Sequence, residues 1–264
     1  MGALSDAFRF LTALPLPQRR GDEGTLAASL SYFPLVGAVI GGALVLTDWA
    51  CGLAFPRATH FLSAALVLAV YAFLTGGLHH DGLMDVADAF WGRRSREERL
   101  RIMKDARAGA LGVTAVVLFL LVELAALYAL PAHVDASPGR LRWAALLSFP
   151  VLGRWMMCYL CVRFPYAREE GTGAVFVKEA AYSSLAPASA LTLAVLAGCF
   201  VFLACVPMLI AALSILALAF AEASGGYFMR ALGGVTGDCV GAAAMFCEAL
   251  VLLLLASRLP ELLL

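Results

Sequence analysis

Three aspartates at helical spacing are the residues of this chain best suited to chemistry. Asp81, Asp85 and Asp88 lie within GGLHHDGLMDVADAFWG, residues 76–92. If the apolar run before them continues as a helix, all three carboxylates project from one face. Anions this close repel one another, so they either take up protons or hold a divalent cation. A hard ion such as Mg²⁺ is the usual partner of carboxylates that also face a phosphate. The alternative interpretation is a solvated acidic loop.

A strongly basic segment, RRSREERLRIMKDARAG (93–109), follows the aspartates. Its simplest interpretation is a juxtamembrane helix that contacts anionic lipid, which we expect of Arg94 and Arg96. The alternative is a phosphate clamp, because phosphoryl transfer needs metal-bound carboxylates beside cations. We predict Lys104 and Arg107 as the clamp. They lie nearest the next apolar run, and Arg107 precedes AlaGlyAla, where backbone can approach a ligand closely.

Two histidines adjoin the aspartates. His79 and His80 are neighbours, so on a helix they point in different directions and at most one faces the carboxylates. That histidine is either a base for a hydroxyl nucleophile or a polar residue at the membrane interface.

Further polar residues lie in two other motifs and one apolar run. RFPYAREEG (163–171) contains Arg168, and ALGGVTGDCVGA (231–242) places Thr236 and Asp238 in a glycine-rich turn. Such a turn at a helix start can present N–H groups to a phosphate, although glycine is also common where membrane helices pack. Arg154 lies inside an apolar run, where an arginine is a candidate functional residue. It could instead pair with an intramembrane glutamate, for which the candidates are Glu123, Glu222 and Glu248.

The composition of the chain indicates that the elements positioning these residues are the helices of an all-α membrane protein. The chain of 264 residues is 62% hydrophobic and 14% charged, against about 25% charged in soluble domains. Its net charge of zero argues against a nucleic-acid partner. Runs near the length of a transmembrane helix predict about seven spans in a single domain, residues 1–264. The predicted spans are 31–54, 61–78, 110–130, 142–162, 186–204, 207–223 and 239–257.

Three smaller predictions concern the N-terminus, one pair of spans and the cysteines. The first residues, up to Arg20, predict an amphipathic helix at the interface instead of a cleavable signal. Residues 186–223 are expected to form two spans, with one long bent helix as the alternative. The seven cysteines are expected to be buried apolar residues, since no second pair or nearby histidine completes a zinc site around Cys158 and Cys161.

The distribution of Lys and Arg predicts the orientation. Most of them, including Arg230, fall in segments 1–30, 79–109, 163–185 and 224–238. By the positive-inside rule these segments are cytoplasmic, so the polar motifs share the cytoplasmic face. The opposite face keeps the few remaining arginines, which are Arg57, Arg140, Arg142 and Arg258.

The motifs TGGLHHDGLMDVADAF, IMKDARAGALG, YAREEG and LGGVTGD together resemble the series found in adenosylcobinamide-GDP ribazoletransferases, also called cobalamin synthases. The resemblance runs in order from FLTALPLP to TGDCVGA and covers nearly the whole chain. His80 departs from it, because an apolar residue is expected in the family's HxDG pattern, which favours His79 as the functional histidine. Ala89 departs as well, since a glycine is more frequent there.

The resemblance implies the last assembly step of vitamin B12 biosynthesis in the bacterial inner membrane. Such enzymes join adenosylcobinamide-GDP to α-ribazole or its 5′-phosphate and release GMP, with Mg²⁺ as cofactor. A homo-oligomer is compatible with the sequence but not required by it. The roles that we assign are base or nucleophile activation for His79 and Asp88, metal binding for Asp81, Asp85, Asp88 and Asp238, and substrate binding for Lys104, Arg107, Arg154, Arg168, Arg230 and Thr236.

Two other functions are weighed against this one. A CDP-alcohol phosphotransferase performs similar chemistry, but its pattern of DGxxAR and a later GxxxDxxxD is not supplied by DGLMDVADAF. A transporter would explain the spans and the intramembrane charges. It would be expected to show broken helices near the middle of the membrane and repeat symmetry, whereas the polar residues here gather at one face.

Overall fold

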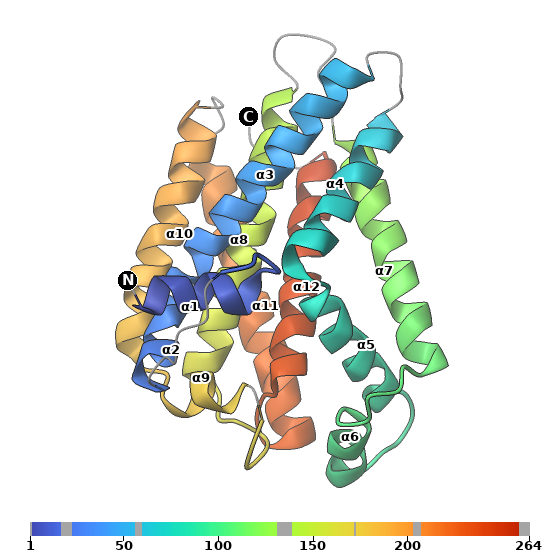
Figure 1. Cartoon of the computed structure of the whole chain (residues 1–264), viewed down its shortest axis with the longest axis vertical. Helices are drawn as coiled ribbons and strands as arrows, with labels where there is room; N and C mark the ends of the chain where they lie inside the picture. Colours follow the sequence, from blue (N-terminus) through green and yellow to red (C-terminus); the bar gives the residue numbers. More distant parts are fainter. Residues whose placement is uncertain are drawn as a thin grey trace.

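A computed structural model describes residues 2–16, 23–55, 60–130, 139–171, 173–202 and 207–258, and over these ranges the regular structure is helical (Figure 1). The elements are α1 (Gly2–Leu11), α2 (Glu23–Ser29), the short 3₁₀ helix η1 (Leu30–Tyr32), α3 (Phe33–Ala54), α4 (His60–Thr75), α5 (Leu78–Phe90), α6 (Arg96–Ile102), α7 (Ala110–Ala129), α8 (Gly139–Arg163), α9 (Ala174–Lys178), α10 (Tyr182–Phe202), α11 (Pro207–Leu232) and α12 (Gly237–Ala256).

Six helices of the described chain are long and apolar enough to cross a membrane, which confirms a polytopic all-α membrane protein. They are the segments Leu26–Ala54, Ala110–Ala129, Leu141–Arg163, Tyr182–Cys199, Met208–Leu232 and Gly237–Ala256. Residues 186–223 form two helices, α10 and α11, as predicted. The residues between them, 203–206, lie outside the described residues.

The second apolar run does not continue as one straight helix into the aspartate motif, which was the condition on which the shared face of the carboxylates was predicted. Helix α4 ends at Thr75, and α5 begins at Leu78 after a bend of 91°. Gly76 and Gly77 make the bend with φ of 60° and 69°, a left-handed conformation that costs glycine little. The α4–α5 pair passes the length and hydropathy test for a span only when both helices are taken together. The aspartates nevertheless share one helix, α5.

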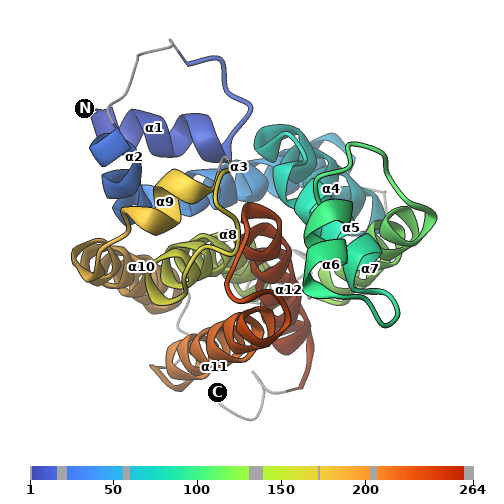
Figure 2. The same ribbon diagram turned by 90° about the horizontal axis from the view of Figure 1, so that it is seen from below.

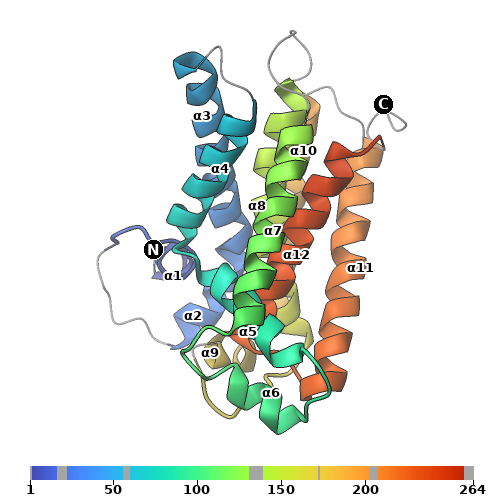
Figure 3. The same cartoon turned by 90° about the vertical axis from the view of Figure 1, so that its right-hand side faces the viewer.

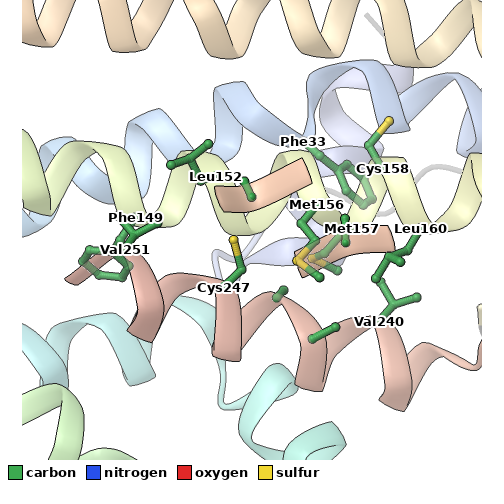
Figure 4. Close-up of a cluster of buried hydrophobic side chains, with 14 of the residues drawn as sticks. Phe33, Phe149, Leu152, Met156, Met157, Cys158, Leu160, Val240, Cys247 and Val251 are labelled. Atoms are coloured by element: carbon green, nitrogen blue, oxygen red, sulfur yellow. The ribbon is translucent and has the colours of Figure 1, made fainter. Parts of the chain in front are cut away.

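Helix α8 lies at the centre of the bundle and packs on α3 and α12. About 78% of its apolar stretch and 72% of that of α12 are buried, against 28% for α7 and α11 and 22% for α10. The central pair therefore forms the core, and the outer helices present apolar side chains outward. Figure 4 shows Leu152 and Met156 of α8 beside Cys247 and Val251 of α12. The cysteines of the described ranges are buried and unbridged, as predicted, and Cys205 lies outside those ranges.

Two glycines allow the close approach of α3 to α8. A Cβ on Gly37 would come within 2.8 Å of the Cα of Val151, and one on Gly41 would come within 2.8 Å of the Cα of Leu147. Small residues four positions apart are a common way for membrane helices to pack backbone against backbone. Because α3 covers one side of α8 in this contact, α12 packs on another side of α8.

The polar motifs gather at one end of the bundle, as the distribution of positive charge predicted. Helices α5, α6 and α9 and the start of α12 lie together at the lower end of Figure 1, and Figure 2 shows that end from below. Figure 3 shows the same grouping from the side. Helix α1 lies across the long helices, which agrees with the predicted N-terminal helix. Arg142, which begins the predicted span 142–162 and was counted on the opposite face, is buried and paired with Asp48 at 2.8 Å.

Candidate active site

Helix α5 carries the aspartates against the N-terminal end of α12. Gly82 makes this contact possible, because a Cβ there would lie 2.9 Å from the backbone oxygen of Asp238. On the aspartate face, Asp81 is exposed, whereas Asp85 and Asp88 are half-buried. The charges of Asp81, Asp88 and Asp238 all act on Asp85, and Arg168 opposes them. This part of the site thus concentrates negative charge around one half-buried carboxylate.

The Asp88 carboxylate caps the start of α7. It accepts hydrogen bonds from the backbone amides of Gly109 and Gly112, each at 2.8 Å. A Cβ on Gly112 would lie 2.5 Å from an Asp88 oxygen, and one on Gly109 would overlap the same carboxylate. We predicted that backbone near Gly109 approaches a ligand closely. In the structure the group that it approaches is Asp88, whose negative charge is favourable at a helix N-terminus.

A short bridge joins the motifs at 163–171 and 231–242. Val235 donates to the Pro165 carbonyl at 2.8 Å, and Ala167 donates to the Val235 carbonyl at 2.9 Å. Gly234 lies directly on the Pro165 carbonyl, where a side chain would overlap it. The contact brings Arg168 within 3.0 Å of Asp238. The two motifs predicted to share a face are therefore in direct contact.

Arg96 ties the basic segment to this bridge. Its Nε donates to the Leu232 carbonyl at 2.5 Å, and Nη2 donates to the Ala167 carbonyl at 3.1 Å. Arg94 donates to the backbone carbonyl of Asp88. Both guanidinium groups thus bind backbone carbonyls, and the lipid contact expected of Arg94 and Arg96 stays a prediction.

A cavity of about 330 Å³ lies between α5, α6 and the segment that leads to α7. Asp85 and Asp88 form one wall. Its other described lining residues are Arg94, Arg101, Ile102, Asp105, Arg107 and Gly109. Carboxylates and arginines thus face one another across a space of the size that small-molecule sites have. Arg107 and the aspartates were predicted as site residues, whereas Arg94, Arg101 and Asp105 were not, because their positions depend on how α6 folds back.

Asp105 holds the guanidinium of Arg107 at the edge of this cavity by two hydrogen bonds. The Arg107 Nη2 lies 2.7 Å from one carboxylate oxygen of Asp105, and its Nε donates to the other at 3.0 Å. These hydrogen bonds lower the pKa of Asp105 to about 2, so the pair stays ionised at neutral pH. The Arg107 side chain is 88% exposed, and a solvent-exposed pair of this kind is easily exchanged for another anion.

The predicted four-carboxylate metal site is not assembled. Within the described ranges, no three His, Cys, Asp or Glu side chains are grouped so as to hold a metal ion. Asp88 is engaged by the α7 amides and Asp238 by Arg168, so each already has a partner for its charge. Their roles as metal ligands, and that of Asp88 in catalysis, stay predictions. Asp81 and Asp85 remain as a carboxylate pair on one face of α5.

Comparison with known proteins agrees with this arrangement of motifs. Residues 3–256 match the model of the family described as Cobalamin-5-phosphate synthase. The chain belongs to this family. It is 37% identical to an adenosylcobinamide-GDP ribazoletransferase of Geotalea daltonii over 95% of each chain. It is 40% identical to one of Chlorobaculum tepidum, over 97% of this chain and 95% of that protein. No solved structure matches.

Several residues that the sequence predicted for the site lie away from the cavity. His79 is 1% exposed, and both ring nitrogens lack a hydrogen-bond partner among the described residues. It lies against Gly241 of α12, in the interior. Lys104 and Arg230 are exposed, but neither lines the described wall of the cavity. Thr236 is buried and caps α12 by accepting a hydrogen bond from the Cys239 amide at 3.2 Å.

Arg154 also lies in the interior of this member of the cobalamin-5-phosphate synthase family. It is fully buried and paired with Glu248, and its Nη1 donates to the Tyr71 hydroxyl at 2.8 Å. Pairing of Arg154 with an intramembrane glutamate was the predicted alternative to substrate binding. Glu222 instead accepts hydrogen bonds from Tyr159 and Arg163, and Glu123 is buried in α7. The contacts of Arg154 therefore join α4, α8 and α12 instead of lining the cavity.

Proposed function

We propose that the chain transfers the adenosylcobinamide-phosphate group of adenosylcobinamide-GDP to α-ribazole or α-ribazole 5′-phosphate and releases GMP. Family membership supports the reaction, because relatives of Geotalea daltonii and Chlorobaculum tepidum are named for it. The single observation that supports the location is the cavity in which Asp85 and Asp88 face Arg94, Arg101 and Arg107. Phosphoryl transfer depends on this combination of carboxylates and cations.

The arginines are proposed to bind the diphosphate of the substrate. Arg94 and Arg101 line the cavity, and Arg107 can exchange Asp105 for a phosphate oxygen, since its guanidinium already presents two parallel donors. A planar guanidinium can bind two oxygens of a phosphate in the same way as it binds the two oxygens of a carboxylate. Holding the diphosphate at this wall would place its phosphorus atoms next to the aspartate face of α5.

Asp81 and Asp85 are proposed to hold Mg²⁺ together with the substrate. Mg²⁺ in phosphate sites is bound by one or two carboxylates, water and the phosphates themselves, so a pair of aspartates on one helix face is sufficient. No hydrogen bond engages Asp85 within the described part of the chain, and neighbouring carboxylates act on it. When bound, the ion would neutralise phosphate charge and stabilise the departing GMP.

The proton of the acceptor hydroxyl is proposed to pass to a carboxylate of α5. The hydroxyl oxygen forms a bond to the cobinamide-side phosphorus, and the bond from that phosphorus to the oxygen shared with GMP breaks. Asp85 is the better candidate for the base, because it lines the cavity, whereas His79 is buried in the interior. The motifs lie at the end of the bundle where basic residues collect, which supports an active site facing the cytoplasm in a bacterial inner membrane.

The test is an assay of GMP release by the purified protein in detergent. Adenosylcobinamide-GDP is supplied with Mg²⁺, with and without α-ribazole. We expect GMP release that depends on α-ribazole and a cobalamin product in equal amount. Release without the acceptor would indicate a hydrolase. No release from adenosylcobinamide-GDP, together with CMP release from a CDP-alcohol, would overturn the proposal in favour of a CDP-alcohol phosphotransferase.

A further inference from the structure

Helix α6 carries cavity residues but has little packing of its own. It is seven residues long, and none of its residues is fully buried. Only Leu100 and Ile102 pack partly against the core. Yet Arg101 lies on it, and Arg94 lies just before it, and both line the cavity. Because apolar burial does not fix α6 strongly, polar contacts must set the distance between this wall and the rest of the site.

Arg96 supplies such contacts at the first residue of α6. Its guanidinium donates to Leu232, the last residue of α11, and to Ala167 in the 163–171 motif. Both acceptors belong to the bridge region, since the Ala167 amide itself donates to the Val235 carbonyl. Gly233 follows Leu232 with a φ of 77°, a conformation that favours glycine, and it lies in van der Waals range of the guanidinium, since a Cβ there would be 3.5 Å from the Arg96 Nε. One side chain therefore fastens α6 to two segments distant in sequence.

The position of these acceptors also favours a guanidinium. The Leu232 carbonyl is at the C-terminus of α11, where a positive charge is stabilised by the helix dipole. Two carbonyls at different angles require two donors in fixed geometry, which arginine has and lysine lacks. Arg99 makes a second contact, over the Phe90 ring at 4.7 Å, but this contact joins α6 to α5 and not to the bridge.

We infer that Arg96 is a positioning residue that holds the α6 wall of the cavity against the bridge between the 163–171 and 231–242 motifs. Arg96 is not part of the described lining of the cavity. It acts through Arg101, whose distance from the aspartates it keeps fixed. In its kinetic consequences this inference depends on the proposed function, because the affected group is the diphosphate of the substrate.

The kinetic test compares Arg96→Ala and Arg96→Lys with Arg93→Ala. Arg93 is an exposed arginine of the same run and serves as the matched loss of charge. Weaker ground-state binding raises KM with little change in kcat, so we expect Arg96→Ala to raise the KM for adenosylcobinamide-GDP about tenfold and to change kcat by less than about threefold. The KM of Arg96→Lys should lie between those of wild type and Arg96→Ala, because lysine has a single ammonium group in place of the planar guanidinium. Arg93→Ala should match wild type.

Rescue by added guanidinium ion separates positioning from general destabilisation. Guanidinium at millimolar concentration should lower the KM of Arg96→Ala and leave Arg93→Ala unchanged. Equal KM values for Arg96→Ala, Arg93→Ala and wild type would overturn the inference, and so would equal increases in both variants. If Arg96→Ala does not fold, Arg96→Lys decides, and a wild-type KM for that variant would refute the role.

A distance measurement tests the inference without any activity. Spin labels at Glu98→Cys on α6 and Glu170→Cys beyond the bridge occupy exposed positions. We expect a single narrow distance distribution in wild type and a broad one with Arg96→Ala, whereas Arg93→Ala should leave it narrow. Unchanged distributions would refute the positioning role. If the wild-type protein releases no GMP but Arg96→Ala still broadens the distance distribution, the proposed function is refuted and the positioning role of Arg96 stands.

Discussion

Replacement of Asp88 by asparagine distinguishes a structural carboxylate from a metal ligand. The Asp88 carboxylate accepts two backbone hydrogen bonds at the start of α7. Asparagine keeps one acceptor oxygen but places an NH₂ group against the second amide, so one bond is lost together with the negative charge at the helix N-terminus. Hydrogen bonds to charged groups contribute about 1.5–3 kcal/mol, and the charge at a helix terminus contributes about 0.3–1 kcal/mol.

We therefore expect Asp88→Asn to lower the free energy of unfolding by about 2–4 kcal/mol. Asp85→Asn is the matched control, because Asp85 lies three residues earlier on the same helix and is also half-buried. It should not lower stability, because burial and the charges of Asp238, Asp81 and Asp88 disfavour the ionised form of Asp85. It should nevertheless reduce turnover at least about a hundredfold, which corresponds to about 2.7 kcal/mol of transition-state stabilisation.

The measurements are thermal unfolding in detergent and the GMP release assay on the same preparations. Equal unfolding temperatures for the two variants would refute the capping role derived from the structure. A stable but inactive Asp88→Asn would restore the original prediction that Asp88 is a metal ligand or a catalytic group. Wild-type turnover of Asp85→Asn would remove that residue from the metal and base roles.

Three further predictions follow from packing and orientation. Gly82→Ala should destabilise the α5–α12 contact and reduce turnover, since the new methyl group would lie 2.9 Å from a backbone oxygen, whereas Gly42→Ala, with open space around it, should be as stable as wild type. Glu248→Gln should lower the free energy of unfolding by about 3–5 kcal/mol, because it leaves Arg154 buried without a counter-charge. Replacement of both residues by Met and Leu should be more stable than Glu248→Gln, and equal or lower stability of that double variant would contradict the reasoning. A cysteine at Glu170 should react with a membrane-impermeant reagent only from the cytoplasmic side, and labelling from the periplasm would disprove the orientation.

Local spacing was sufficient to identify the reactive helix. Asp81, Asp85 and Asp88 lie on one face of α5, because a spacing of four and three residues places side chains together on any α-helix. The apolar runs predicted the membrane spans for a similar reason, since the length of an apolar segment relates directly to bilayer thickness. The grouping of basic loops predicted that the polar motifs share one end of the bundle.

The partner of each polar side chain could not be predicted in this way. Arg96 and Arg94 look alike in sequence, and only the tertiary structure shows that Arg96 binds carbonyls far away in the chain, whereas Arg94 binds that of Asp88, six residues earlier. The break at Gly76 and Gly77 was also missed, because a pair of glycines is common in membrane helices and need not end one.

The sequence by itself determined the class of protein, the position of the spans, the common face of the polar motifs and the carboxylate helix, because these depend on composition and on spacing along one chain. The tertiary structure decided which charges face the cavity and which are neutralised elsewhere. Asp88 lies against the α7 amides, Arg154 is buried with Glu248, and Arg101 lines the same cavity as Asp85 and Asp88. These outcomes depend on contacts between residues distant in sequence, where the free energy of pairing a buried charge selects one partner among several that the sequence allows.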